Sequence, residues 1–87
     1  MDIGKAIKLC RMQKNLSQSD LAKLADISIS YLSLLERGKR DPNFSTVIRI
    51  TQGLQIPLTL LIYLAEQPEF SKELNEKLSY AALRILD

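Results

Sequence analysis

The side chains best suited to chemistry in this sequence lie between residues 29 and 40. If residues 29–37 form a helix, the 3.6-residue repeat turns Leu32 and Leu35 toward a core and leaves a mixed face on the opposite side. Serine hydroxyls can hydrogen-bond to base edges, and isoleucine and leucine side chains can pack on thymine methyl groups. The chemistry of this outward face therefore suits reading of DNA bases, with a preference for A·T steps, by Ile29, Ser30, Ser33 and Leu34.

Positively charged and polar residues surround this face and could bind phosphates. A basic loop (residues 39–41, closed by Pro42) follows the helix, and Gln18 lies in the first turn of an earlier helix, where backbone amides favour an anion. Phosphate contacts position a protein on DNA without specifying a sequence. The expected phosphate contacts are Gln18, Tyr31, Arg37, Lys39, Arg40 and Asn43.

Two short capped helices would hold these residues. Ser17 is the predicted N-cap of helix 18–25 and forms a capping-box variant with Asp20. Leu21, Leu24 and Ala25 repeat at helical spacing in this helix, and Ser28 caps the next one. Asp26 lies between them, where a short polar side chain tolerates a left-handed backbone. The pattern predicts two crossed helices, a helix-turn-helix.

Four further helices complete an all-α prediction. They span about residues 3–14, 44–53, 58–66 and 69–86, with Asn43 as an N-cap, Pro57 at a start and Pro68 at a break. The predicted core residues of the first two are Ile3, Ile7, Cys10, Phe44, Val47, Ile48, Ile50 and Leu54. Residues 1–66 are thus expected to form one small domain, with residues 67–87 as an added C-terminal helix.

The last two predicted helices carry more apolar surface than so small a domain can bury. Helix 58–66 has almost no polar face, and helix 69–86 is amphipathic. Either they cover each other within a subunit or they form a homodimer interface. The expected interface residues are Leu60, Tyr63, Leu64, Phe70, Leu74, Leu78, Ala81 and Ile85.

Composition excludes several classes of function. The chain has 87 residues, no histidine and one cysteine, so imidazole-based catalysis and a zinc site are not expected, and no cofactor is predicted. The longest apolar run, residues 56–65, is about half of what a membrane-spanning helix needs. The N-terminus lacks signal-peptide features, which favours the cytoplasm.

The charges are unevenly distributed along the chain. Residues 1–40 carry 8 basic and 4 acidic side chains, so we expect the N-terminal part of the chain to face a polyanion such as DNA.

The spacing of these motifs resembles the phage repressor and Cro type of helix-turn-helix regulators, the XRE family. Over about residues 3–62 the matching positions are Leu16, Gln18, Leu21, Ala22, Ile27, Ser28, Leu32, Glu36, Arg37, Gly38, Pro42, Ile50, Leu54 and Ile56. The resemblance implies a five-helix lambda-repressor-like domain, here with an additional C-terminal helix. Left-handed positions where the family usually has glycine are occupied here by Asn15, Asp26 and Gln55.

The resemblance also implies roles for individual residues. It assigns base contacts to Ile29, Ser30 and Leu34 and a backbone-clamping role to Gln18. It pairs Arg11 with Glu36 as a structural link between the first and third helices. Glu36 is therefore not expected to contact DNA.

Two functions fit these observations. The first is a homodimeric transcriptional repressor or controller protein that binds double-stranded DNA at palindromic operators. The alternative is an antitoxin or other partner-binding regulator, whose C-terminal helix holds a second protein and whose helix-turn-helix serves autoregulation. What the C-terminal helix contacts would discriminate between them.

Overall fold

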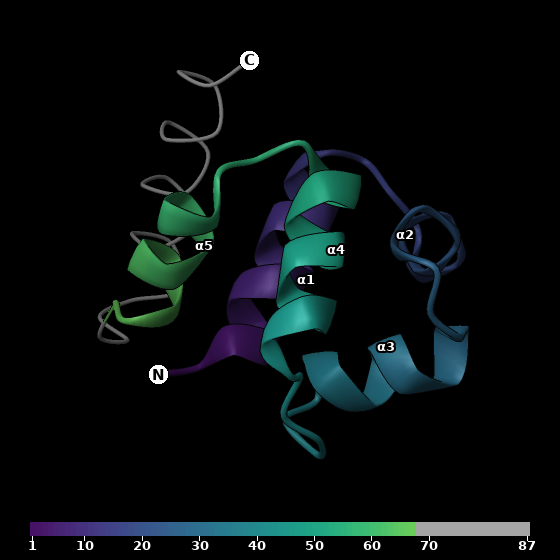
Figure 1. The fold of residues 1–87 in the computed structure, drawn as a ribbon, viewed down its shortest axis with the longest axis horizontal. Coiled ribbons are helices and arrows are strands. Elements are labelled where there is room, and N and C mark those ends of the chain that lie inside the picture. The colour runs from purple at the N-terminus through teal and green to yellow at the C-terminus, as the bar shows by residue number, and fades with distance from the viewer. Residues whose placement is uncertain (68–87) are drawn as a thin grey trace.

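The computed structural model describes residues 1–67, which form five α-helices and contain no β-strand (Figure 1). The helices are α1 (Ile3–Gln13), α2 (Gln18–Ala25), α3 (Ile29–Glu36), α4 (Phe44–Leu54) and α5 (Leu58–Ala65). Each boundary lies within one residue of the prediction. The predicted sixth helix lies outside the described residues, together with Phe70, Leu74, Leu78, Ala81 and Ile85.

Side-chain caps begin the helices where the sequence predicted them. The Ser17 Oγ accepts from the Asp20 amide over 3.0 Å, and the Ser17 amide donates to the Asp20 carboxylate over 3.1 Å, which completes the capping box. The hydrogen bond from the Ser17 backbone amide, followed by the interaction with the Ser17 hydroxyl, lowers the pKa of the Asp20 carboxyl. Ser28 and Asn43 cap α3 and α4 over 3.0 and 2.8 Å. The expected caps are confirmed.

Four residues with positive φ end helices by the same hydrogen-bond pattern. Asn15, Asp26 and Gln55 have φ of 59°, 57° and 56°, and Gly38 has φ of 73°. In each case the next residue donates its amide to a carbonyl five residues earlier, over 2.9 to 3.1 Å. The predicted left-handed positions are therefore confirmed, and Gln55 closes α4 in the same way as the shorter side chains close α1 and α2.

Buried apolar side chains from all five helices form one core. The largest fully buried side chains are Ile7, Cys10, Leu21, Leu32, Leu35, Ile50, Leu54 and Leu61. Burial raises the pKa of the Cys10 thiol to about 11, so it is protonated at neutral pH. Within residues 1–67 there is no cluster of histidine, cysteine, aspartate or glutamate that could hold a metal ion.

One expected core residue is exposed instead. Phe44, predicted to face inward, is 71% exposed because it is the first residue of α4, one turn before the buried face that begins at Thr46 and Val47. Leu24, for which only the helical spacing was noted, is 59% exposed because α2 buries the face formed by Leu21, Ala22 and Ala25. The prediction for Phe44 was wrong because helical spacing alone does not reveal where the neighbouring helices end.

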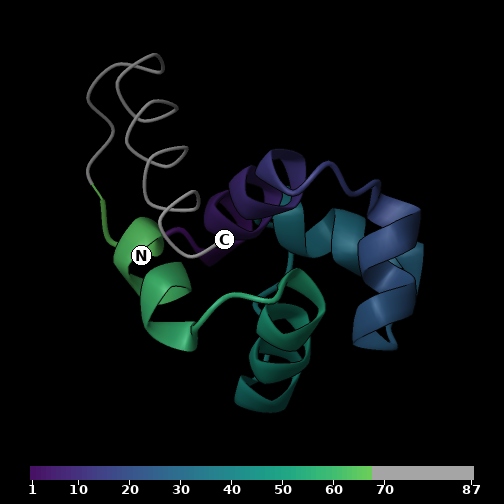
Figure 2. The same cartoon turned by 90° about the horizontal axis from the view of Figure 1, so that it is seen from above.

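The helix-turn-helix and α5 lie at opposite ends of the domain. α1 and α4 occupy the middle, with α2 and α3 on one side and α5 on the other, in both views (Figures 1 and 2). α2 packs on α4 and α3, while α1 packs on α5 and α3. The Asp2 amide donates to the Ala65 carbonyl over 2.8 Å and fastens the end of α5 to the start of α1.

α1 approaches α3 closely enough to exclude any side chain at Gly4. A Cβ added at Gly4 would lie 2.0 Å from the carbonyl oxygen of Leu35 and 3.0 Å from its carbonyl carbon. Since Leu35 is buried near the end of α3, this contact fixes the distance between α1 and α3.

No single helix within residues 1–67 is long and apolar enough to cross a membrane. α4 and α5 reach that length and composition only as a pair, and they are bent by 108° at the break between them. Five residues of α4 are buried inside the domain.

Candidate nucleic-acid interface

The outward face of α3 carries the side chains expected to read bases. Leu32 and Leu35 are fully buried, which turns the opposite side of the helix outward. Ile29 is 50% exposed and Ser30 is exposed, whereas Ser33 and Leu34 are half-buried. About half of the Ile29 side chain is thus accessible at the start of the helix and can contact a ligand.

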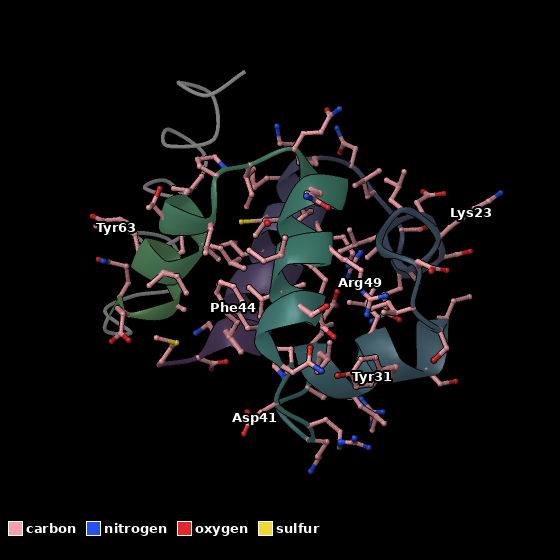
Figure 3. The ribbon with its side chains drawn as sticks, in the orientation of Figure 1. Lys23, Tyr31, Asp41, Phe44, Arg49 and Tyr63 are labelled. Carbon is pink, nitrogen blue, oxygen red and sulfur yellow. The ribbon has the colours of Figure 1, made fainter. Side chains whose placement is uncertain are left out.

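Cations gather at the C-terminal end of the same helix. Arg37, Lys39 and Arg40 are exposed, and the Arg37 Nε donates to the Ser33 carbonyl over 3.2 Å. The Arg40 guanidinium lies 5.7 Å from the centre of the Tyr31 ring, a cation–π contact that holds the basic loop beside α3. Figure 3 labels Tyr31 and Asp41 at this end of the domain. The side chains of Arg37, Lys39 and Arg40 thus place positive charge next to the outward face of α3.

Behind this surface, a nearly buried ion pair joins α1 to α3. The Arg11 Nε donates to Glu36 Oε2 over 2.7 Å, and Nη2 donates to Oε1 over 3.0 Å. The Arg11 and Glu36 side chains are 12% and 1% exposed. The third Arg11 contact, from Nη1 to the Leu16 carbonyl over 2.8 Å, ties the loop before α2 to the same pair. The structure therefore contains the pair that the family resemblance implied, and Glu36 faces inward.

Besides Arg37, two further expected phosphate contacts make hydrogen bonds within the protein. The Gln18 Nε2 donates to Glu36 Oε1 over 3.1 Å, a contact that the sequence did not indicate because the two residues lie in different helices. The Asn43 Oδ1 accepts from the Thr46 amide as the cap of α4. Each amide still has an N–H that these bonds do not use.

A model of the helix-turn-helix family HTH_3 matches residues 7–61 of this chain. This span runs from α1 into α5 and includes the whole of α2, α3 and the turn between them. The chain belongs to the HTH_3 helix-turn-helix family. Residues 7–61 therefore form a DNA-binding domain of the kind found in transcriptional regulators, and the lambda-repressor-like, all-helical prediction is confirmed.

Curated relatives of this helix-turn-helix domain are regulators by name. The immunity repressor protein of Bacillus phage phi105 is 34% identical over 62 residues, which cover 71% of this chain and 43% of the relative. YqaE, an HTH-type transcriptional regulator of Bacillus subtilis (strain 168), is 30% identical over 83 residues, covering 90% and 72%. ClgR, a transcriptional regulator of Mycobacterium tuberculosis (strain ATCC 25618 / H37Rv), is 28% identical over 60 residues, covering 69% and 54%. The chain spans less than half the length of the phage repressor.

Arg49 supports the helix-turn-helix from behind, a role that sequence reasoning missed. Its guanidinium donates to the carbonyl of Asp26 in the α2–α3 turn and to Thr46 Oγ1, each over 3.4 Å. Its Nε is buried and has no hydrogen-bond partner. The side chain lies between α4 and the α2–α3 pair (Figure 3). In the sequence Arg49 stood out only as one more charge, since nothing local links it to a turn 23 residues earlier.

The helix-turn-helix domain leaves apolar side chains of α5 partly uncovered. Tyr63 is 57% exposed and is labelled at the far end of the domain in Figure 3. Leu60 and Leu64 are half-buried, whereas Leu61 and Ala65 face the core. Leu60, Tyr63 and Leu64 are the residues of the predicted dimer interface that lie within the described part of the chain.

Proposed function

We propose that this protein is a sequence-specific transcriptional regulator, a repressor or controller protein, that binds double-stranded DNA in the cytoplasm. The observation that carries the proposal is the outward face of α3, where apolar and hydroxyl side chains are exposed beside the cations of the basic loop. Ile29 lies at the start of this face, and Arg37, Lys39 and Arg40 lie at and beyond its C-terminal end, so base contacts and phosphate contacts can be made from one side of the domain.

In this proposal α3 lies in the major groove and the surrounding residues hold the backbone. Ile29 and Leu34 pack on thymine methyl groups, and Ser30 and Ser33 hydrogen-bond to base edges. Gln18, Tyr31, Arg37, Lys39, Arg40 and Asn43 meet phosphates on either side of the groove. Two of the four proposed base-contacting side chains are apolar and would pack on thymine methyl groups. We therefore expect the preferred DNA site to be rich in A·T pairs.

We further propose that the regulator binds as a homodimer through α5. The apolar surface of Leu60, Tyr63 and Leu64 supports this, and the expected interface continues into residues 70–85. α5 and α3 lie at opposite ends of the domain, so a dimer formed through α5 keeps both recognition helices free for DNA (Figures 1 and 2). When two DNA-binding domains are joined in a dimer, binding of the first to its half-site holds the second close to the other half-site, which raises the affinity for the whole operator.

Selection of bound duplexes from a random DNA pool tests the function and the symmetry together. We expect enrichment of an inverted repeat rich in A·T pairs, with half-site centres about 34 Å apart. Sedimentation of the free protein should show a dimer at about 100 μM, well above the roughly micromolar dissociation constants such interfaces reach. A pool without enrichment would contradict the regulator, and a monomer at that concentration would contradict the dimer. A monomer whose α5 surface binds a different protein would favour the alternative of an antitoxin or other partner-binding regulator.

A further inference from the structure

The bond between Gln18 and Glu36 connects the proposed DNA surface to the buried ion pair. Glu36 Oε1 accepts from Gln18 Nε2 over 3.1 Å and from Arg11 Nη2 over 3.0 Å. Because the Glu36 side chain is 1% exposed and Arg11 contacts both of its oxygens, this acceptor has a fixed position. Gln18 is half-buried at the first position of α2, so its amide bridges the interior and the surface.

The carboxylate selects one orientation of the Gln18 amide. A glutamine amide carries two N–H donors at one end and a carbonyl acceptor at the other, whereas an ionised carboxylate only accepts. Turning the amide over would place its carbonyl oxygen against Glu36, two acceptors in contact. The observed orientation leaves the second N–H of Nε2 for another acceptor, and a phosphate oxygen also only accepts.

We propose that Glu36 is a positioning residue for the Gln18 phosphate contact, in addition to its role in joining α1 to α3. The buried ion pair orders the Gln18 side chain before DNA arrives, so that less conformational freedom is lost on binding. Ordering one long side chain in advance corresponds to about a two- to tenfold gain in affinity. This inference rests on the proposed function, because its ligand is the DNA backbone.

Nuclear magnetic resonance of the 87-residue chain without DNA tests the first half of the inference. We expect the Gln18 side-chain amide to show restricted motion and a downfield-shifted Nε2 proton, as a hydrogen bond to a carboxylate requires. The exposed glutamines Gln52 and Gln55 are internal controls with free side chains. Gln18 signals with the order parameter and shifts of Gln52 and Gln55 would overturn the inference, whatever the protein binds.

A mutant cycle on the selected operator tests the second half. In the variant Arg11→Met/Glu36→Met an apolar pair replaces the ion pair, so that no charge is left buried alone. We expect Gln18→Ala to weaken binding about tenfold, as loss of a hydrogen bond to a charged group predicts. The apolar pair should weaken binding about threefold by freeing Gln18.

The combined variant distinguishes positioning from a purely structural role. If Glu36 acts through Gln18, the apolar pair should cause no further loss in a Gln18→Ala background. An equal loss with and without Gln18 would show that the ion pair affects DNA binding only through the fold, and would overturn the inference. A wild-type protein that binds no DNA but keeps the ordered amide would instead contradict the proposed function alone.

Discussion

Gly4→Ala is expected to destabilise the domain by about 3 kcal/mol or more, at the upper end of what overpacking usually costs. The new Cβ would lie 2.0 Å from the Leu35 carbonyl oxygen. The α1 backbone fixes the position of this Cβ and the oxygen belongs to the α3 backbone, so neither atom can rotate aside as the end of a side chain can. Relief requires α1 and α3 to separate, which would also displace Glu36 and the end of the recognition helix. Denaturant unfolding of the full chain measures the loss.

Gly53→Ala is the matched control, since it also adds one methyl group within a helix. Its Cβ would lie 3.2 Å from Leu21 Cδ1, which side-chain rotation can move, and 3.2 Å from Leu24 Cβ, which a shift of α2 by a few tenths of an ångström would relieve. Alanine also favours the helix by about 1 kcal/mol over glycine, which offsets the crowding. We expect Gly53→Ala to stay within about 1 kcal/mol of the wild type. Equal stabilities for the Gly4 and Gly53 variants would show that the α1–α3 approach is less close than described.

Arg11→Ala is expected to lower stability by about 3 kcal/mol. The substitution leaves the Glu36 carboxylate, which is 1% exposed, with the Gln18 amide as its one remaining partner among the hydrogen bonds described for it. The Leu16 carbonyl also loses its Arg11 donor. For a domain of this size the loss corresponds to a fall of roughly 12 °C or more in Tm, which thermal unfolding would register.

Arg37→Ala is the control for the Arg11 prediction, because Arg37 is an exposed arginine whose described contact is with the Ser33 carbonyl. Its Tm should change by no more than a few degrees, as for most surface substitutions. If Arg11→Ala left Tm unchanged and abolished DNA binding, Arg11 would be a phosphate contact rather than a structural residue.

Local features of this fold could be predicted from the sequence, because their causes lie within a few residues. The caps at Ser17, Ser28 and Asn43 and the left-handed ends at Asn15 and Asp26 each depend on one side chain and the adjacent backbone. The five helix boundaries followed from these signals together with apolar periodicity.

Features that depend on distant segments could not be predicted in the same way. Periodicity placed Phe44 in the core, but its burial depends on where the neighbouring helices end. The close approach at Gly4, the bond from Gln18 to Glu36 and the contact of Arg49 with the α2–α3 turn join segments 18 or more residues apart. The Arg11–Glu36 pair, 25 residues apart, was expected only through the family resemblance.

The central claim, that α3 reads bases while the residues around it hold phosphates, is tested most directly by comparing two variants. Binding of Leu34→Ala and Arg40→Ala is titrated on the selected operator and on a scrambled duplex at several salt concentrations. Arg40→Ala should weaken binding to both duplexes alike and reduce the salt slope by about one, since one fewer counterion is released per contact. Leu34→Ala should keep the slope and lose about 1 kcal/mol or more on the operator alone. Equal losses on both duplexes for Leu34→Ala would contradict the docking of α3 in the major groove.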